Sequence, residues 1–303
     1  MPSSFTIIVN PAAGRGRARR LLPGLEERLA AIRLDAEVVV SPAPDEPVPL
    51  ARAALERGRC VVACGGDGLV GQLAAEVSAA GGVLGILPVG AGNDFARHLG
   101  FDVGRPFEAL AALATGRVTA LDLGRVNGRP FCSVAGTGFD AAAAAWAAGV
   151  GYLSGTPLYV AAVLRTLATY RPRRLRIAAD GAVREVSAWL VAAANGRYYG
   201  GGMMIAPEAR TDDGTLEVAV VGPVSRPGFL MTFPKVFKGT HTTHPQVEVF
   251  AARRVVIEDL GHGPPLDVIA DGERVGPLPG EIEIAPGALR VIVPATEREG
   301  SES

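Results

Sequence analysis

The stretch "CVVACGGDGLVGQLAAEV", residues 60–77, decides the fold of the first part of this chain. Its apolar start, Cys60–Cys64, is typical of a buried strand, and the apolar residues from Leu69 to Val77 recur at helical spacing. Between them lie three glycines and Asp67, which form either a tight turn or a loop whose backbone closely approaches a ligand. Asp67 would accordingly either cap the following helix or hold Mg²⁺ against phosphate groups.

The segments around this stretch repeat the alternation of strand and helix. We expect strands at residues 5–10, 35–40, 60–64 and 83–90, and helices at residues 18–32, 49–58, 69–82 and 93–100. Continuous apolar strands that alternate with helices favour a parallel sheet covered on both faces.

The pattern changes near Leu121, where short strands begin to follow one another. Turn sequences typical of hairpins, "VNGRP", "ADGAV" and "ADGER", separate several of these strands. This half should be mainly antiparallel β, with helices inserted around residues 141–170 and 227–239. The boundary near residue 122 gives two domains, 1–122 and 123–303.

Composition narrows the class of protein. The 303 residues suffice for two domains, and a formal net charge of −1 gives no electrostatic reason to expect nucleic acid as a partner. Three cysteines form no disulfide framework and fit a reducing cytoplasm. Cys60 and Cys64 could be metal ligands, but the apolar strand between them favours small buried residues. The first residues have no basic and apolar pattern of a signal peptide.

The segment Ala141–Leu164 is uncharged and long enough to span a bilayer. Four residues that interrupt a helix argue against a span: Gly149, Gly151, Gly155 and Pro157. The sequence predicts a loop here, followed by a helix that starts near Pro157.

Three glycine-containing loops follow expected strands of the first domain: "NPAAGRGRA", "GGDG" and "PVGAGNDFAR". In an open parallel sheet such loops gather at the carboxyl ends of the strands, where ligands bind. Glycines let backbone N–H groups approach phosphate oxygens, although no loop has the Gly-Lys-Ser/Thr ending of a Walker A motif. The loops predict a nucleotide site of another kind. In the third loop, Asp94 either belongs to this site or forms a helix N-cap with Asn93.

These motifs resemble the diacylglycerol kinase catalytic-domain family, which bacterial lipid kinases share with sphingosine and ceramide kinases. The resemblance continues with "GGGMMIAPEARTDDGTLEVAVV" and "ADGE", and so covers nearly the whole chain in the right order. It implies an α/β, phosphofructokinase-like nucleotide domain followed by a mainly-β, C-terminal β-sandwich domain, with the active site in the interdomain cleft. It also implies that the tail after about Pro286 returns to the first domain.

The resemblance implies a set of nucleotide-binding residues. The loop that would wrap the ATP phosphates comprises Gly65, Gly66, Asp67, Gly68, Leu69, Val70 and Gly71. Further residues would line the same cleft or contact the nucleotide: Asn10, Gly14, Ser41, Ala91 and Asn93. Asp67 and Asp94 are also implied to take part in catalysis.

The resemblance assigns two further roles in the second half. Glu273 in "ADGE" matches the proposed general base of the family. The alternative is an ordinary hairpin turn with a solvated glutamate. Asp213 in "RTDDGTL" matches a structural Mg²⁺ ligand, with the carbonyl groups of Arg210 and Thr215 completing that site. An ordinary turn is the alternative for this motif as well.

The chain departs from the family pattern at two loop positions. Leu69 and Ala91 replace threonines whose hydroxyl groups are implied to face phosphate, and Gly71-Gln72 replaces a common Asn-Glu pair. Sphingosine kinases also carry leucine after GGDG, so Leu69 does not exclude kinase activity. Loss of both hydroxyls leaves weak ATP binding, a different nucleotide or a degenerate enzyme as alternatives.

The resulting functional prediction is an ATP- and Mg²⁺-dependent kinase of a membrane-lipid hydroxyl, such as that of diacylglycerol. The alternatives are a catalytically weak or dead lipid-binding regulatory protein and an NAD kinase. The expected location is cytoplasmic, peripheral to the inner face of the membrane, with the lipid as partner. Oligomeric state stays open, and a homodimer is compatible with the sequence.

One further stretch, "PGFLMTFPKVFKGTH", bears on the membrane. Phe229, Phe233 and Phe237 recur at helical spacing, although Pro234 must interrupt the helix. The only two lysines of the chain, at positions 235 and 238, lie in the same stretch. It is either a contact with anionic lipid or a short core helix with two surface lysines.

Overall fold

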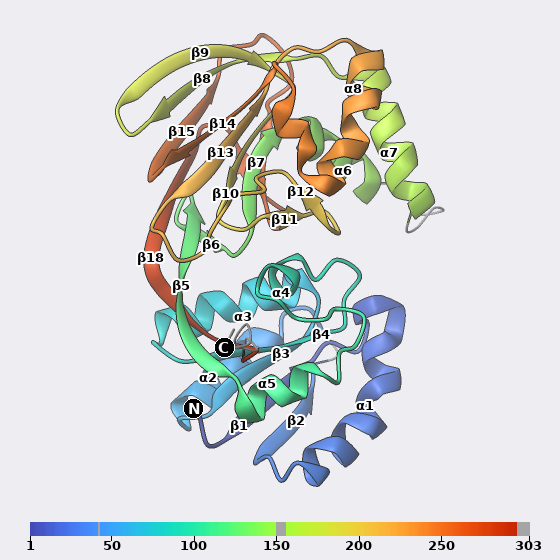
Figure 1. Ribbon diagram of the computed structural model, residues 1–303, viewed down its shortest axis with the longest axis vertical. Coiled ribbons are helices and arrows are strands. Elements are labelled where there is room, and N and C mark those ends of the chain that lie inside the picture. The colour runs from blue at the N-terminus through green and yellow to red at the C-terminus, as the bar shows by residue number, and fades with distance from the viewer. Residues whose placement is uncertain (42, 150–155, 296–303) are drawn as a thin grey trace, which may run out of the picture. The chain divides into compact units, whose positions relative to one another are not determined.

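The computed structural model describes residues 1–41, 43–149 and 156–295 (Figure 1). The chain forms two compact units: unit 1 comprises Met1–Leu121 and, of the described residues after it, 287–295, and unit 2 comprises Asp122–Pro286. Two strands, β5 (Arg117–Val126) and β18 (Gly280–Val293), each run from one unit into the other. The expected combination of an α/β domain with a mainly-β domain is confirmed.

Unit 1 is built on a parallel sheet. Its strands lie in the order β2 (Ala36–Val40), β1 (Phe5–Val9), β3 (Cys60–Gly65) and β4 (Leu84–Pro88), with the end of β18 parallel to β4. Every residue of β1, β3 and β4 is buried, which explains their continuous apolar sequences.

Among the described residues, five helices connect the strands of unit 1. They are α1 (Ala13–Ala31), α2 (Pro47–Glu56), α3 (Asp67–Ala79), α4 (Asp94–His98) and α5 (Ala109–Thr115), of which α5 was not expected. The helical spacing in α3 is confirmed, because Leu69, Leu73 and Val77 are all buried.

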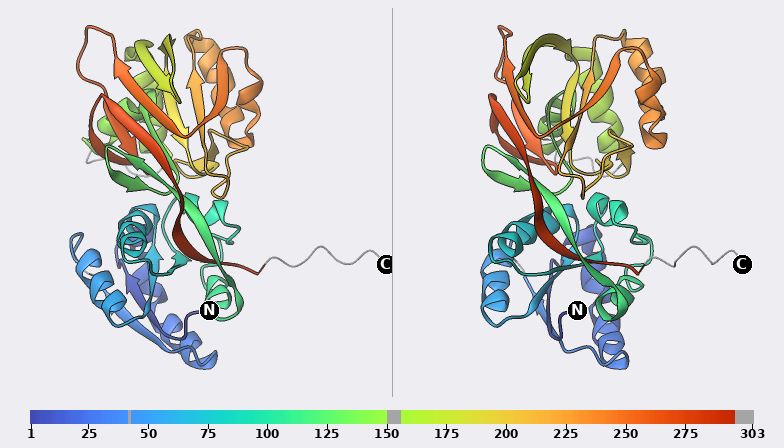
Figure 2. Two further views of the ribbon diagram at one scale, coloured as in Figure 1. Left: turned by 90° about the vertical axis from the view of Figure 1, so that its left-hand side faces the viewer. Right: turned by 60° about the vertical axis from the view of Figure 1, so that its left-hand side comes forward.

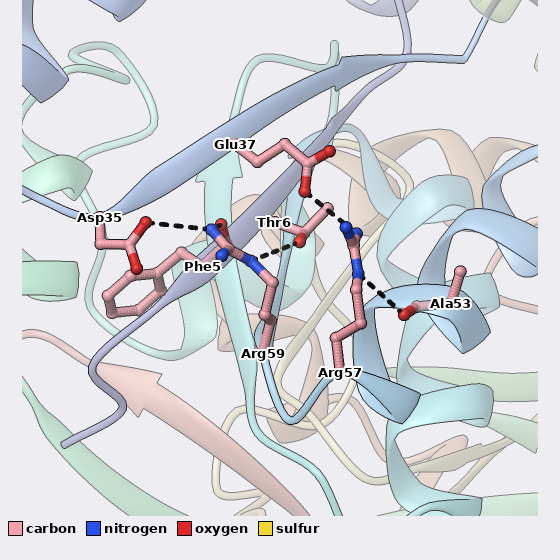
Figure 3. Close-up of polar contacts among 7 residues, drawn as sticks. All are labelled: Phe5, Thr6, Asp35, Glu37, Ala53, Arg57 and Arg59. Carbon is pink, nitrogen blue, oxygen red and sulfur yellow. Dashed lines mark hydrogen bonds and ion pairs between the residues drawn. The ribbon is translucent and has the colours of Figure 1, made fainter.

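Two arginines hold together the end of this sheet at which β1 and β3 begin (Figure 3). Arg59 donates hydrogen bonds to the Phe5 carbonyl oxygen (2.6 Å) and to Thr6 Oγ1 (3.1 Å), and it pairs with Asp35. Arg57 pairs with Glu37 at 3.0 Å. The glycine loops lie at the opposite ends of the same strands, so these arginines are remote from them.

Unit 2 is a β-sandwich (Figure 2). One sheet contains the start of β18, then β15 (Arg254–Asp259), β8 (Arg173–Ala179) and β9 (Ala182–Ala188), while β6 (Arg129–Phe131) pairs with β5. The other runs β14 (Val247–Ala252), β13 (Leu216–Val221), β10 (Leu190–Ala194), β7 (Val134–Gly138), β16 (Asp267–Ala270) and β17 (Glu273–Pro277). β11 (Tyr198–Tyr199) and β12 (Met203–Met204) form a short hairpin. A continuous apolar core contains residues of both sheets.

All three expected hairpin turns are present in unit 2. Each has two successive residues at positive φ: Asn127-Gly128, Asp180-Gly181 and Asp271-Gly272. This is the conformation that Asn-Gly and Asp-Gly pairs adopt most readily between antiparallel strands.

Two helical segments lie on the sandwich: α6 (Phe139–Ala148) with α7 (Thr156–Thr169), and α8 (Arg226–Thr232) with the 3₁₀ helices η1 (Phe233–Lys238) and η2 (Thr240–Thr243). These helices confirm those expected around residues 141–170 and 227–239. The loop expected from Ala141 is wrong up to Ala148, because an alanine-rich run has high helix propensity. The helix near Pro157 is confirmed, and Gly151 and Gly155 lie outside the described residues. No helix in the described ranges is long and apolar enough to cross a membrane.

The three cysteines are buried, as expected of small core residues. Burial raises the pKa of the Cys60 and Cys64 thiols to about 12, so neither is a reactive thiolate. Within the described ranges, no group of three or more His, Cys, Asp or Glu side chains could hold a metal ion.

Candidate active site

The loops after β3 and β4 contact each other through their backbones. The Gly65 carbonyl oxygen accepts hydrogen bonds from the N–H groups of Val89 (2.9 Å) and Gly90 (3.0 Å). A Cβ atom added at Gly90 would lie only 2.3 Å from the Gly66 Cα atom. The glycines are therefore required for these two loops to meet.

The loop after β1 joins the same cluster. The Asn10 N–H group donates to the Cys64 carbonyl oxygen (3.1 Å), and Asn10 Oδ1 accepts from Ala12 N–H (3.0 Å). Gly14 has φ = +58°, and a Cβ atom there would lie 2.2 Å from the Val89 carbonyl oxygen. Three loops separated by up to eighty residues thus meet at the carboxyl ends of β1, β3 and β4.

Asp67 connects this cluster to α4. It is the first residue of α3, yet its Oδ1 atom accepts a hydrogen bond from Phe95 N–H (3.2 Å) in the first turn of α4. Burial raises the pKa of the Asp67 carboxyl, and hydrogen bonds from the backbone of residues 93–95 oppose this rise. Asp67 therefore does not cap its own helix, which has no side-chain cap, but stabilises the neighbouring one.

The expected N-cap by Asn93 and Asp94 is only partly correct. Asn93 occupies the N-cap position with φ = 56°, but no side-chain cap hydrogen bond forms. Instead, its amide bonds both the N–H group (2.8 Å) and the carbonyl oxygen (2.9 Å) of Gly90, which fixes the third loop. Asp94 is buried. Asp67 supplies the acceptor that the cap position lacks.

The two positions that depart from the family pattern have different surroundings. Leu69 is buried, and its side chain lies so close to Gly65 that a Cβ atom there would be 2.7 Å from Leu69 Cδ2. Ala91, in contrast, is exposed on its loop. Ser41 is buried, and its hydroxyl donates to the Ala43 carbonyl oxygen at 3.1 Å.

In unit 2, Asp271 fixes the "ADGE" turn. Its carboxylate accepts hydrogen bonds from the N–H groups of Cys132 (2.6 Å), Ser133 (2.9 Å) and Val134 (3.1 Å). Its own N–H group donates to the Val134 carbonyl oxygen (3.0 Å). Three N–H groups on one carboxylate hold this turn rigidly against the start of β7.

Glu273 follows this turn as the first residue of β17. Its carboxylate pairs with the guanidinium group of Arg129 in β6. The two side chains are 42% and 46% exposed, so the carboxylate is accessible as well as oriented.

The "TDDG" loop is attached to the same region by Asp122. Asp122 Oδ2 accepts from Gly214 N–H (2.7 Å), and the Asp122 N–H group donates to the Thr211 carbonyl oxygen (2.6 Å). Asp213 Oδ1 accepts from the N–H group (2.9 Å) and the hydroxyl (2.9 Å) of Thr215. Arg210 pairs with Asp212 rather than with Asp213.

Asn195 links the strand that carries Asp122 to the segment held by Asp271. Its side-chain amide donates to the carbonyl oxygens of Asp122 (3.0 Å) and Cys132 (2.8 Å) in the interior of unit 2. Sequence reasoning missed Asp122, Asn195 and Asp271. A polar residue inside an apolar run, as in "VAAANG", was the available signal for Asn195.

Unit 2 also contains an apolar cavity of about 70 Å³. Its walls come from α6, β10, α8, η1 and η2, and include Phe139, Leu190, Phe229, Phe233, Val236 and His241. The lining also contains an acidic residue, Asp140. Although part of the residue reaches solvent, burial raises the pKa of its carboxyl to about 6.

Asp140 predicts a pH-dependent stability. A folded-state pKa of about 6 lies above the usual value, so its contribution to stability is present at low pH and is lost as pH rises through 6. Asp140→Asn keeps the acceptor for Ala141 N–H and should raise the free energy of unfolding at pH 7 by about 1–3 kcal/mol.

Denaturant unfolding between pH 4 and pH 8 measures this effect. The control is Asp180→Asn, because hydrogen bonds from Arg253 and Arg254 lower the pKa of Asp180, so its loss should destabilise at neutral pH. Parallel pH profiles for wild type and Asp140→Asn would contradict the assignment.

Two family models match the chain. The model described as the diacylglycerol kinase catalytic domain covers residues 4–126, and the YegS C-terminal NAD kinase beta sandwich-like domain covers residues 133–293. A diacylglycerol kinase of Mycobacterium tuberculosis (strain ATCC 25618 / H37Rv) is 35% identical over 297 residues, with 95% of this chain and 94% of the relative covered. The chain belongs to the diacylglycerol kinase family.

Other relatives span the same length. The diacylglycerol kinase of Bacillus subtilis (strain 168) is 25% identical, with 97% of each chain covered. A Pseudomonas aeruginosa PAO1 protein named probable lipid kinase YegS-like is 34% identical, with 78% of this chain and 76% of the relative covered.

Solved structures share the fold of this diacylglycerol kinase family member. One from Bacillus anthracis str. Sterne has a TM-score of 0.78 at 26% identity, with 96% of this chain and 97% of the other covered. Another from the same strain, described as a diacylglycerol kinase, has a TM-score of 0.74 at 24% identity over the same shares. The resemblance implied by the motifs is thereby confirmed.

Asp213→Ala tests the prediction, implied by the family resemblance, that the "TDDG" loop binds a metal ion. Asp213 is exposed, and carboxylate oxygens are ligands that Mg²⁺ accepts. If this loop binds the ion, Mg²⁺ should raise the melting temperature of the wild type by a few degrees and that of Asp213→Ala by much less.

The neighbouring acid provides the control. Asp212→Ala removes an exposed carboxylate that pairs with Arg210, so it should leave the Mg²⁺-dependent shift intact. Equal shifts in the wild type and Asp213→Ala would assign "TDDG" to an ordinary turn.

Proposed function

We propose that the protein is an ATP- and Mg²⁺-dependent lipid kinase that phosphorylates the hydroxyl group of diacylglycerol or a related membrane lipid. The observation that carries the proposal is the meeting of three glycine loops beside Asp67, in a chain of this family. Phosphoryl transfer requires mainly positioning and charge neutralisation, which such a backbone cradle can provide.

The nucleotide would bind at the loops of unit 1. Backbone N–H groups of loops that meet through glycine can approach phosphate oxygens closely. Mg²⁺ is usually held by one or two carboxylates together with phosphate oxygens, and Asp67 with Asp94 fits this donor set. When bound, Mg²⁺ neutralises the charge that develops on the transferred phosphoryl group.

Glu273 would orient the acceptor hydroxyl and take its proton. A general base must be accessible and held in a defined direction. The exposure of Glu273, its pairing with Arg129 and the rigid turn fixed by Asp271 support this role. Asp271 and Asn195 would act only through position, since they bind backbone groups.

The acceptor is proposed to be a lipid rather than NAD. The walls of the unit 2 cavity are almost entirely hydrocarbon, which suits an acyl chain and offers few partners for a dinucleotide. The relatives that cover most of the chain carry the names diacylglycerol kinase and probable lipid kinase.

A degenerate enzyme is the second candidate, motivated by Leu69 and Ala91. The argument from Leu69 is the weaker one, because Leu69 is buried and fills space against Gly65. Only at Ala91 does the substitution affect an exposed loop position. One neutral hydrogen bond contributes about 0.5–1.5 kcal/mol, which weakens nucleotide binding without abolishing it.

A coupled assay tests the proposal directly. Purified protein with Mg²⁺-ATP should form phosphatidic acid from dioleoylglycerol in mixed micelles and should form no NADP from NAD. ATP use that requires NAD would support the NAD kinase alternative, and no ATP use with any acceptor would support the regulatory protein.

A further inference from the structure

The segment α8–η1 exposes large apolar side chains to solvent. Met231 is 76% exposed, Phe237 is 47% exposed and Leu230 is 45% exposed. These are three of the eight large apolar side chains that the described ranges expose, and they lie within eight positions of one another. Isolated exposed apolar residues are normal, but such a concentration indicates a contact surface.

The exposure of Phe237 follows from a change of helix type. An α-helix would place Phe229, Phe233 and Phe237 on one stripe. Pro234 cannot continue the α-helical hydrogen bonds, so α8 ends at Thr232 and η1 continues as a 3₁₀ helix. At three residues per turn, residues i and i+3 share a face.

The 3₁₀ period divides η1 into three faces. Phe233 and Val236 face the interior, where Phe233 stacks on Phe229. The second face, Pro234 and Phe237, is exposed and apolar, and the third, which carries both lysines, is exposed and cationic. An apolar face therefore lies directly beside a charged one.

The cations of this surface have no acidic partners. Residues 218–247 contain no Asp or Glu, although the chain has 31 acidic residues. Lys235 and Lys238 form no ion pair with any residue in the described ranges. Helix α7, whose Leu167 carbonyl oxygen accepts a hydrogen bond from Arg226 (2.8 Å), contributes no acid either, because residues 141–179 lack Asp and Glu. The acid packed on the inner side of the segment is Asp140 of α6, which lines the cavity together with Phe233 and Val236.

We propose that Leu230, Met231, Lys235, Phe237 and Lys238 form a docking surface for an anionic phospholipid bilayer. Apolar side chains beside cations that form no ion pair in the described ranges match the boundary between acyl chains and anionic headgroups. The inference rests on the proposed function in one respect, since a lipid kinase must reach its acceptor in a membrane.

The type of cation favours a bilayer over an acidic protein. Apart from these two lysines and the histidines, every basic residue of the chain is an arginine. The planar guanidinium group of arginine binds carboxylates in a fixed geometry. Lys235 and Lys238 are instead compact, hydrated charges on flexible stems. Such charges suit the diffuse potential of a headgroup layer and contribute little to a geometrically specific protein contact.

Vesicle flotation with two double variants tests the surface. Vesicles contain phosphatidylglycerol and phosphatidylcholine in equal parts, or phosphatidylcholine alone. Because each cation near an anionic surface contributes about fivefold, Lys235→Glu with Lys238→Glu should lower the anionic-vesicle partition coefficient at least about tenfold. Met231→Ser with Phe237→Ser should lower it severalfold.

Matched controls separate this surface from general effects. Arg33→Glu with Arg253→Glu makes the same change of net charge at exposed positions on other elements. Val183→Ser removes another exposed apolar side chain, on β9. These controls should bind vesicles as the wild type does, and all variants should melt within a few degrees of it because exposed charges contribute little to stability.

Three results would overturn the inference: no preference of the wild type for anionic vesicles, an equal loss in the controls, or a loss in the lysine variant alone. The last result would indicate a polyanion site of the kind that an acidic protein uses.

A soluble substrate distinguishes this inference from the proposed function. All variants should phosphorylate a short-chain, water-soluble diacylglycerol at the wild-type rate and be slowed only on vesicles. Normal phosphorylation with unchanged vesicle binding would reject the docking surface alone. Loss of vesicle binding in a protein that phosphorylates no lipid would reject the kinase function alone.

Discussion

Glu273→Gln is expected to lower kcat for lipid phosphorylation by about 10²–10⁴-fold, the usual contribution of a general base. Glutamine has nearly the same shape, so the turn fixed by Asp271 should keep its structure. The KM for ATP and the melting temperature should change little, because the glycine loops belong to the other unit. Steady-state kinetics with dioleoylglycerol micelles measures both parameters.

The control for this variant is Glu281→Gln. Glu281 is 49% exposed and pairs with Arg254, so its substitution removes an equivalent ion pair without touching the "ADGE" turn. Its kcat should equal that of the wild type. Similar kcat values for Glu273→Gln and Glu281→Gln would return Glu273 to the role of a solvated turn residue.

Asp67→Asn should lower kcat/KM at least about a hundredfold and remove the Mg²⁺ dependence of ATP binding. An amide oxygen is a poor ligand for a hard cation, and the charge stabilisation that a metal supplies amounts to several kcal/mol. The amide can still accept the hydrogen bond from Phe95 N–H, so α4 should remain in place. Calorimetric titration of ATP with and without Mg²⁺ is the measurement.

Asp102→Asn provides a matched comparison, because Asp102 also accepts a backbone N–H bond within unit 1, from Gly104 (2.9 Å). This variant should bind Mg²⁺-ATP as the wild type does. An Asp67→Asn protein that binds Mg²⁺-ATP normally but melts earlier would show that Asp67 serves only the loop structure.

Much of the fold could be predicted because its signals are local. Continuous apolar runs mark the buried strands of unit 1, and the Asn-Gly and Asp-Gly pairs mark the hairpins of unit 2. The helices expected around residues 141–170 are confirmed, but the loop expected from Ala141 is wrong up to Ala148, since glycines further along the chain outweighed the helix propensity of alanine. Local signals also fail for α5, whose short sequence has no cap or clear period.

The candidate site was predictable only in part. Spacing and resemblance identified Asp67 and Glu273, but not the contact of Asp67 with α4, which joins residues 28 positions apart. Asp122 and Asn195 lie in strands or at their ends, where no local pattern distinguishes a buried polar link from an ordinary residue. Such links become visible only when the chain is folded.

The segment of residues 227–241 shows how one residue changes a prediction. The core-helix alternative for "PGFLMTFPKVFKGTH" is confirmed for Phe229 and Phe233, which pack in the core, whereas Phe237 is exposed and the lipid contact stays a proposal. Pro234 separates the two outcomes by converting an α-helical stripe into three 3₁₀ faces.

The transfer of phosphate from ATP to a lipid tests the central claim most directly. Purified protein is incubated with a total bacterial lipid extract, Mg²⁺ and ATP labelled in its γ-phosphoryl group, and the organic phase is separated and identified. A labelled phospholipid that is absent with Glu273→Gln is the expected result, with phosphatidic acid as the main product. Label that stays in the aqueous phase, at the same level with and without lipid, would contradict it.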